Sequence, residues 1–106
     1  MNILFVCSRN QWRSPTAEAI YKDEPGLSVR SAGTEPSARI RLTAKSIEWA
    51  DLIFVMEKRH RQRIQDRFGV ETVNGKVVVL DIPDDYQFMD PELIDEIRNG
   101  VEPFLK

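Results

Sequence analysis

Short apolar runs alternate along this chain with longer, mixed stretches. The runs at residues 2–6, 52–56 and 77–80 are almost entirely aliphatic or aromatic, which is typical of strands buried on both faces of a parallel sheet. Residues 27–30 alternate apolar and polar positions, so we predict a shorter strand there, followed by a turn at residues 31–34. Because the apolar runs leave no polar face, other elements must cover both sides of the sheet.

The mixed stretches carry apolar residues at helical spacing. Ser14 and Pro15 provide a capping hydroxyl and a proline for the first helical position, so we predict a helix that starts here and ends before Pro25. Residues 40–49 and 58–68 are predicted as two further helices. Each predicted strand is therefore separated from the next by a helix.

A last helix follows the fourth predicted strand. Asp90 and Pro91 give its cap and its first residue, and its apolar positions should face the core: Leu93, Ile94, Ile97, Val101 and Phe104. Strands that alternate with helices predict an α/β fold, here a single-domain, four-stranded parallel sheet flanked by helices with right-handed crossovers. Such sheets bind ligands at the carboxyl ends of their strands.

The composition fits one domain and narrows the class of partner. The 106 residues are 42% hydrophobic and 30% charged, as in a globular domain with one core, and we expect residues 1–106 to form it. Lys and Arg number 15 against 17 Asp and Glu, for a net charge of -2 without a basic block, so no nucleic-acid partner is expected. No apolar run approaches the roughly 20 residues that span a bilayer, and no basic leader precedes the first strand; we therefore expect a cytoplasmic protein without a membrane partner.

The first predicted strand leads into the only cysteine of the chain. Cys7 is followed six positions later by Arg13, and Ser14 opens the first helix. A short loop between the carboxyl end of a strand and the amino end of a helix points backbone amides at one spot, where the helix dipole adds positive potential. This predicts a phosphate-binding loop after strand one, with the expected phosphate-binding residues Ser8, Arg9, Asn10, Gln11, Trp12, Arg13 and Ser14. Without such a loop, a lone cysteine is as readily a small buried hydrophobe.

The same loop holds candidates for phosphoryl transfer. This reaction needs an in-line nucleophile, neutralised phosphoryl oxygens and a protonated leaving group. The field that would bind phosphate also stabilises a thiolate, so Cys7 could attack phosphorus to form a phosphocysteine. Arg13 would hold two phosphoryl oxygens with its planar fork, and Ser14 would donate a hydrogen bond to the thiolate. The sequence thus indicates a metal-independent phosphomonoester hydrolase that uses no cofactor.

A proton donor is expected after the fourth strand, at the same edge of the sheet. Residues 81–86 contain three aspartates, and we favour Asp84 as the general acid. Asp81 is the reserve candidate, and Asp85 is close enough in sequence to share the proton. The sequence alone leaves the choice among these three open.

Taken together, these motifs resemble the low-molecular-weight protein tyrosine phosphatases. The matching residues run in family order over most of the chain: Val6-Cys7, Asn10, Arg13-Ser14-Pro15, Ala17-Glu18, Ser31-Ala32-Gly33-Thr34 and Trp49-Ala50-Asp51-Leu52-Ile53. The resemblance implies a cysteine-dependent protein-tyrosine phosphatase that acts on phosphorylated protein or a small aryl phosphate. It implies that Asn10 takes a left-handed backbone conformation and that Asn10, Ser14 and Ser31 support the loop. It also places Asp84 in the catalytic-acid position, ahead of Tyr86.

Several positions depart from the family pattern. Arg9 stands where a small residue is usual, and Asp85 stands where proline is usual. Gln11 and Trp12 replace an apolar residue and a cysteine, and the chain is shorter than typical members between residues 33 and 47. These departures motivate an alternative function, a non-catalytic module that binds phosphate or a phosphoprotein. A thiol-linked arsenate reductase would need further cysteines, which the sequence lacks.

For four other residues, a structural role must be weighed against a functional one. Asp90 is expected to cap a helix, and Trp49, just ahead of the third strand, to lie in the core. His60 belongs to a polar helix whose charges we expect to face solvent, and no metal-ligand set accompanies it in the sequence. Trp12 is expected either to line the mouth of the phosphate site or to pack inward.

Overall fold

A central sheet of four parallel strands organises this computed structural model, which describes residues 1–105. The strands are β1 (Asn2–Cys7), β2 (Ser28–Gly33), β3 (Leu52–Val55) and β4 (Val77–Val79), and they lie in the order β2-β1-β3-β4. All three strand pairs are parallel. The predicted α/β fold, a four-stranded parallel sheet flanked by helices, is confirmed.

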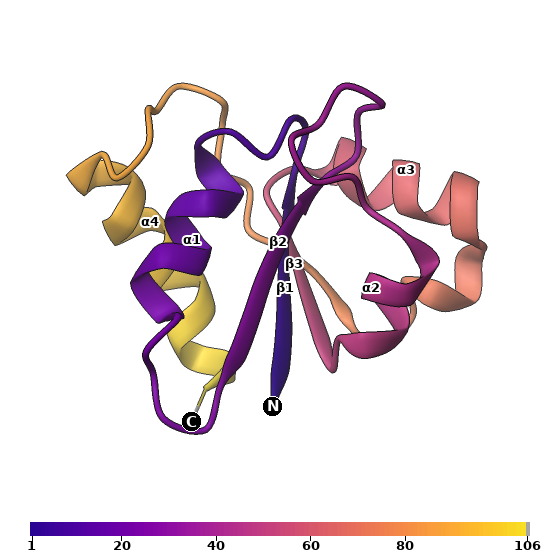
Figure 1. Cartoon of the computed structure of the whole chain (residues 1–106), viewed down its shortest axis with the longest axis horizontal. Coiled ribbons are helices and arrows are strands. Elements are labelled where there is room, and N and C mark those ends of the chain that lie inside the picture. The colour runs from indigo at the N-terminus through magenta and orange to yellow at the C-terminus, as the bar shows by residue number, and fades with distance from the viewer. Residues whose placement is uncertain (106) are drawn as a thin grey trace.

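Helices cover both faces of this sheet. On one face lie α1 (Arg13–Tyr21) and α4 (Pro91–Val101), and on the other lie α2 (Ala44–Trp49) and α3 (Lys58–Phe68) (Figure 1). Two short 3₁₀ turns, η1 (Val70–Thr72) and η2 (Glu102–Phe104), complete the described elements. None of the helices in residues 1–105 combines the length and the apolar character needed to cross a membrane.

The core divides into two layers because side chains alternate along β1. Ile3 and Phe5 are fully buried in the layer under α1 and α4, where Phe5 stacks between Tyr21 and Phe54. Leu4 and the residues that share its side of the sheet form the second layer, under α2 and α3. Burial on both faces is what the continuous apolar runs predict. The carboxyl ends of the strands are thereby held in one rigid edge.

The end of β2 and the segment that follows it differ from their sequence predictions. The turn predicted at residues 31–34 is wrong for its first three positions, because they pair with β1 and extend β2 to Gly33. The helix predicted at residues 40–49 begins only at Ala44, since Arg41 bridges to Gly33 in the extended conformation. The shorter α2 starts instead at a capping box in which Thr43 is the N-cap residue.

Helix starts were predicted with mixed success. Helix α1 begins at Arg13, one residue before Ser14, and no side chain caps it. The prediction that Ser14 caps this helix is wrong, because its hydroxyl contacts the sulfur of Cys7 instead. Asp90 does cap α4, accepting a hydrogen bond from the Glu92 amide at 2.9 Å with Pro91 as the first helical residue. Helix α3 matches its prediction at both ends.

Candidate active site

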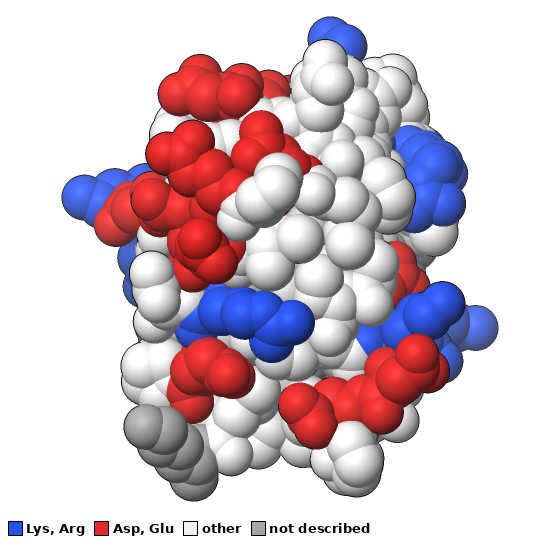
Figure 2. Space-filling model, turned by 90° about the vertical axis from the view of Figure 1, so that its left-hand side faces the viewer, with Lys and Arg blue, Asp and Glu red and all other residues white. Residues whose placement is uncertain are grey.

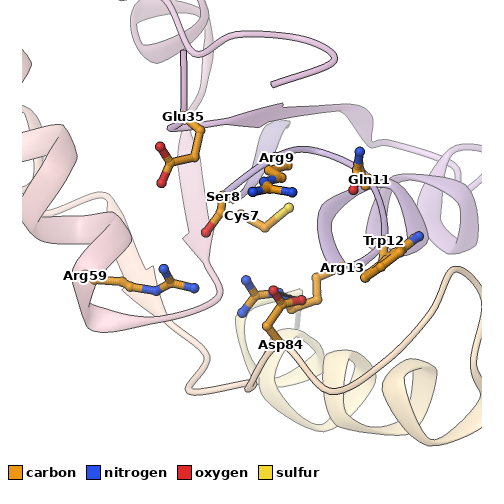
Figure 3. Close-up of a pocket in the computed structure, with 9 residues that line it drawn as sticks. All are labelled: Cys7, Ser8, Arg9, Gln11, Trp12, Arg13, Glu35, Arg59 and Asp84. Atoms are coloured by element: carbon orange, nitrogen blue, oxygen red, sulfur yellow. Dashed lines mark ion pairs between the residues drawn. The ribbon is translucent and has the colours of Figure 1, made fainter. Parts of the chain in front are cut away.

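A hollow of about 320 Å³ is lined by residues from the carboxyl end of β1 and from the first turns of α1 and α3. Most of its wall is the loop between β1 and α1, and the rest comes from the segments that follow β2, β3 and β4 (Figure 3). The lining residues are Cys7, Ser8, Arg9, Gln11, Trp12, Arg13, Glu35, Arg59 and Asp84. Seven of these nine were predicted site residues, and Glu35 and Arg59 were not.

The loop turns its carbonyl oxygens away from the hollow. Four successive carbonyls, those of residues 7–10, accept hydrogen bonds from residues 34–39: Thr34 N to Cys7 O (3.0 Å), Glu35 N to Ser8 O (2.9 Å), Arg39 N to Arg9 O (3.0 Å) and Arg39 Nε to Asn10 O (3.1 Å). Within the described chain, the amides of residues 8–13 donate to no other protein group. A loop with its carbonyls fixed on one side leaves its N–H groups for an anion on the other.

Gly33 allows this close approach of the two segments. A Cβ at this position would lie 2.6 Å from Ser8 O and 2.6 Å from the Ala38 Cβ. Neither contact has room for a methyl group, and one of them is backbone. Glycine at position 33 is therefore a requirement of the loop geometry and not of a turn, since Gly33 is in a strand.

Asn10 braces the loop from behind. Its backbone φ is 57°, the left-handed conformation that asparagine tolerates better than most residues. Its fully buried Nδ2 donates to Ser14 Oγ and to Ser31 Oγ, both at 2.9 Å. Ser31 Oγ in turn donates to Glu18 Oε1 at 2.5 Å. The side chains of Asn10 and Ser14 thus do not line the hollow; they tie the loop to α1 and β2.

Cys7 contacts the hollow and the core at once. Its side chain is only 3% exposed, it packs in the layer under α1 and α4, and it also lines the hollow. The sulfur lies 3.0 Å from Ser14 Oγ. Because that oxygen already accepts from Asn10, its hydrogen is available to the sulfur or, at 3.4 Å, to the Ala32 carbonyl. Cys7 is thus buried but not turned away from the concave surface.

Arg13 is buried at the base of the hollow and held on one side. Its side chain is 2% exposed, and Nη1 donates to Glu57 Oε1 at 2.5 Å and to Ile82 O at 2.8 Å. The Nε atom lies 3.6 Å from Asp84 Oδ1. The fixed Nη1 leaves the other guanidinium nitrogens for a ligand, and a planar fork in one orientation is suited to a phosphoryl group.

Glu57 is the anion that fixes Arg13. Burial opposes its ionisation, but hydrogen bonds from Arg59 and Arg13 outweigh burial, and the pKa of Glu57 is lowered below its usual value. The carboxylate therefore stays charged and shares Oε1 between Arg13 and Arg59, the latter at 3.0 Å. The sequence analysis missed Glu57, although its place two residues after the end of β3 puts it at the same edge of the sheet.

Among the three aspartates of residues 81–86, only Asp84 lines the hollow. It is 52% exposed, and its carboxylate lies beside the guanidinium of Arg13 (Figure 3). Asp81 lines a second depression, beside α3, and has a positive φ of 56°. Asp85 is exposed and lines neither. The geometry thus favours the aspartate that we prefer on sequence.

The charged side chains around His60 are exposed, as predicted, but His60 itself does not face solvent. It is 1% exposed, its Nδ1 accepts the Glu57 amide at 3.0 Å, and its Nε2 lies 2.9 Å from Ser8 Oγ. Burial, followed by the nearby charges of Arg13 and Arg59, lowers its pKa from 6.5 to about 4. The signal that sequence analysis overlooked is the spacing of four to Ile64, which is fully buried on the same side of α3.

The two tryptophans occupy different environments. Trp12 is 42% exposed and lines the mouth of the hollow, which is the first of its two predicted positions. Trp49 packs against the layer under α2 and α3, with the Arg30 guanidinium 4.1 Å from its ring centre. The structural interpretation of Trp49 is therefore correct.

Positively charged side chains are concentrated around the hollow. Arg9, Arg13 and Arg59 converge on the hollow although the chain has a net charge of -2. By contrast, acidic side chains gather toward one end of the face that α1 and α4 cover (Figure 2). Within residues 1–105, no group of three or more His, Cys, Asp or Glu side chains is arranged to hold a metal ion.

Comparison with known proteins finds phosphatases. Residues 2–47 match the family model described as low molecular weight phosphotyrosine protein phosphatase. A probable low molecular weight protein-tyrosine-phosphatase of Ralstonia nicotianae, EpsP, is 31% identical over 136 residues, which cover 97% of this chain and 92% of the relative. A protein-arginine-phosphatase of Bacillus subtilis is 34% identical over 96 residues, which cover 65% of this chain and 64% of the relative.

Solved structures share the fold. A low molecular weight phosphotyrosine phosphatase from Vibrio cholerae O395 superposes with a TM-score of 0.80 at 21% identity, over 99% of this chain and 94% of that one. The YwlE arginine phosphatase, as a C7S mutant with a phosphorylated active site serine, superposes with a TM-score of 0.73 at 27% identity, over 100% and 97%. Tyrosine- and arginine-directed phosphatases are thus both among the similar proteins.

Proposed function

The chain belongs to the low molecular weight protein-tyrosine-phosphatase family, and from this premise we propose that it hydrolyses protein phosphotyrosine through a phosphocysteine on Cys7. The observation that carries the proposal is the position of one sulfur. Cys7 lines a hollow that Arg13 also lines, and within the described chain the loop amides around it have no protein hydrogen-bond partner. Amides, guanidinium and helix dipole together stabilise both a thiolate and a phosphoryl dianion.

The reaction has two displacements at phosphorus. In the first, the Cys7 thiolate forms the P–S bond as the P–O bond to the leaving group breaks, and the leaving oxygen takes a proton from Asp84. In the second, water attacks phosphorus, Asp84 accepts its proton, the P–S bond breaks and inorganic phosphate leaves. The thiolate and the protonated Asp84 are then restored, so both atoms and charges balance over one cycle.

Arg13 would stabilise the charge that spreads over the equatorial oxygens in each displacement. The guanidinium of Arg13 is already oriented for this role, because Glu57 and the Ile82 carbonyl hold Nη1 before any ligand binds. A donor that needs no rearrangement is worth more in the transition state than a mobile one. Ser14 would donate to the sulfur when it leaves, from a hydroxyl that Asn10 already orients.

Phosphotyrosine is the favoured substrate because of the mouth of the hollow. The half-exposed indole of Trp12 offers a flat surface on which an aryl phosphate would stack. A second candidate is phosphoarginine, favoured by the relative that acts on it and by the carboxylates of Glu35 and Asp84 at the same mouth. Those carboxylates would suit a cationic side chain, whereas the phosphotyrosine reaction uses Asp84 alone and has no role for Glu35.

The test compares purified parent and Cys7→Ser proteins on p-nitrophenyl phosphate, a phosphotyrosine peptide and a phosphoarginine peptide. We expect hydrolysis by the parent, fastest on the phosphotyrosine peptide, and a loss of at least about 10³-fold in the variant. Equal rates in the two proteins would end the proposal. Phosphate binding by thermal shift without any turnover by the parent would favour the non-catalytic module, and faster hydrolysis of phosphoarginine would replace the substrate.

A further inference from the structure

Ser8 is a lining residue that the mechanism above does not use. Its side chain lies in the wall of the hollow, next to Cys7 (Figure 3). Its hydroxyl oxygen lies 2.9 Å from His60 Nε2. His60 comes from the first turn of α3, 52 positions later in the chain, and is 1% exposed. A buried imidazole thus contacts a side chain of the loop that surrounds the sulfur.

The two nitrogens of His60 have different roles. Nδ1 lies 3.0 Å from the Glu57 amide, which can only donate, so Nδ1 accepts and carries no hydrogen. In the neutral ring the hydrogen must then be on Nε2, and Nε2 donates to Ser8 Oγ. Because burial and the neighbouring arginines lower the pKa of His60 to about 4, the ring stays neutral near pH 7.

This fixes the direction of the Ser8 hydroxyl. An oxygen that accepts from His60 keeps its own hydrogen for another acceptor, and within the described residues Ser8 Oγ has no second hydrogen-bond partner. The alternative tautomer would reverse the bond and direct the hydroxyl hydrogen at the imidazole. The Glu57 amide excludes that tautomer, since it would meet an N–H on Nδ1.

We propose that Ser8 Oγ is an additional hydrogen-bond donor to the bound phosphoryl group and that His60 is the positioning residue that holds it. The inference rests on the proposed function in that it uses the same hollow. The bond to Ser8 is not required by α3 itself. At the start of this helix the side chain of His60 accepts the Glu57 amide, and that bond uses Nδ1 alone.

Two substitutions of His60 separate its two hydrogen bonds. In His60→Asn, the amide oxygen takes the place of Nδ1 and keeps the helix cap, but nothing reaches Ser8. In His60→Gln, the longer side chain brings an N–H to the place of Nε2 and keeps the bond to Ser8, while the cap is lost. A helix-only role and a positioning role therefore predict opposite results for the same pair.

The readouts are the Kd of inorganic phosphate by thermal shift and the KM for p-nitrophenyl phosphate. We expect His60→Asn to weaken phosphate binding and raise KM by about fivefold to tenfold, as for one lost hydrogen bond, with a thermal midpoint close to the parent. His60→Gln should stay within about threefold of the parent in both readouts and melt earlier. Ser8→Ala should match His60→Asn, and the double variant should lose nothing more. Gln62→Ala, which removes an exposed hydrogen bond to Asp66 on the same helix, is the control.

The inference is overturned if His60→Asn binds phosphate like the parent, or if the losses in His60→Asn and Ser8→Ala add in the double variant. Phosphate binding does not depend on turnover, so this result is separate from that of the proposed function. A parent that fails to hydrolyse any phosphoester, with phosphate binding still weakened by His60→Asn, would remove the enzyme and leave the inference intact.

Discussion

The loop after β1 and the loop after β4 meet at one edge of the sheet, yet they are built in opposite ways (Figure 1). In the first, Cys7, Asn10 and Arg13 are at most 3% exposed, and four successive carbonyls are hydrogen-bonded to the segment after β2. In the second, Asp84 and Phe88 are each 52% exposed. The first loop thus buries the side chains proposed to act on the phosphoryl group, whereas the second leaves the proposed proton donor half exposed.

The contrast separates two tasks of the proposed enzyme. Groups that bind the phosphoryl oxygens must be in place before the substrate, and the folded core supplies that order. The proton donor needs access to a leaving group and to water, and an exposed loop supplies that access. Substitutions in the first loop should therefore change stability and activity together, whereas substitutions in the second should change activity alone.

The largest effect is expected for Arg13→Lys. Lysine keeps the charge but cannot hold two phosphoryl oxygens in a plane, so we expect kcat/KM to fall by about 10³-fold. The carboxylate of Glu57 and the Ile82 carbonyl also lose their geometry, which should lower the free energy of unfolding by about 2 kcal/mol in urea titrations. Arg61→Lys, at an exposed position of α3, is the matched control. A normal stability for Arg13→Lys would break the comparison between the loops.

Next is Asp84→Asn, in the exposed loop. Loss of the general acid should lower kcat for a phosphotyrosine peptide by roughly 10²-fold to 10³-fold, and much less for an ester with a good leaving group. The free energy of unfolding should change by less than about 0.5 kcal/mol, because the side chain is half exposed. Asp85→Asn and Asp81→Asn serve as controls. If either control lost as much activity as Asp84→Asn, the acid would be assigned wrongly.

Acid should weaken the protein through His60. Its pKa is about 4 in the folded chain and about 6.5 when unfolded, so between these values only the unfolded state binds the proton. Stability from the neutral ring is thus complete above pH 6.5 and is lost as the pH falls toward 4, by roughly 3 kcal/mol in total. Urea titrations from pH 7 to 4 measure this loss. His60→Asn should flatten the pH dependence, and an unchanged slope would contradict the burial of a neutral ring.

The smallest effect concerns the backbone at Asn10. Asn10→Gly keeps a residue that accepts a φ of 57° and removes the bonds to Ser14 and Ser31, which should lower the free energy of unfolding by about 1–2 kcal/mol. Asn10→Ala adds the strain of a left-handed alanine, about 1 kcal/mol more. The difference between the two variants in urea isolates that strain. Equal stability would show that the loop relaxes to another conformation.

Much of this fold could be predicted from hydrophobic pattern alone. The buried strands are nearly continuous apolar runs, so periodicity and burial agree, and α3 is bounded by Glu57 and Gly69 as its sequence suggests. The helix predicted at residues 40–49 forms only from Ala44, because Leu42 is apolar for a reason other than helical packing. It is buried in the layer under α2 and α3 as part of an extended segment, and pattern does not distinguish the two.

Parts of the site could not be predicted from the sequence, because the same side chain can take different hydrogen-bond partners. Ser14 stands at a helix start, where a hydroxyl usually caps; which partner it takes depends on Asn10 and on the sulfur, and both are set by tertiary structure. His60 lies among charged neighbours, and its burial follows from the packing of α3 against the loop. Glu57 is likewise identified only once Arg13 is in place.

The central claim is that the sulfur of Cys7 forms a bond to phosphorus. Rapid acid quenching of the enzyme with p-nitrophenyl phosphate, followed by peptide mass spectrometry, tests it directly. For the parent we expect one phosphoryl group, on the peptide that contains Cys7. Asp84→Asn should carry this group at a higher level where water attack limits its turnover. Cys7→Ser should carry no such group at the same time point. A parent that hydrolyses the ester without any phosphoryl group on Cys7, under quench conditions that preserve a thiophosphate, would contradict it.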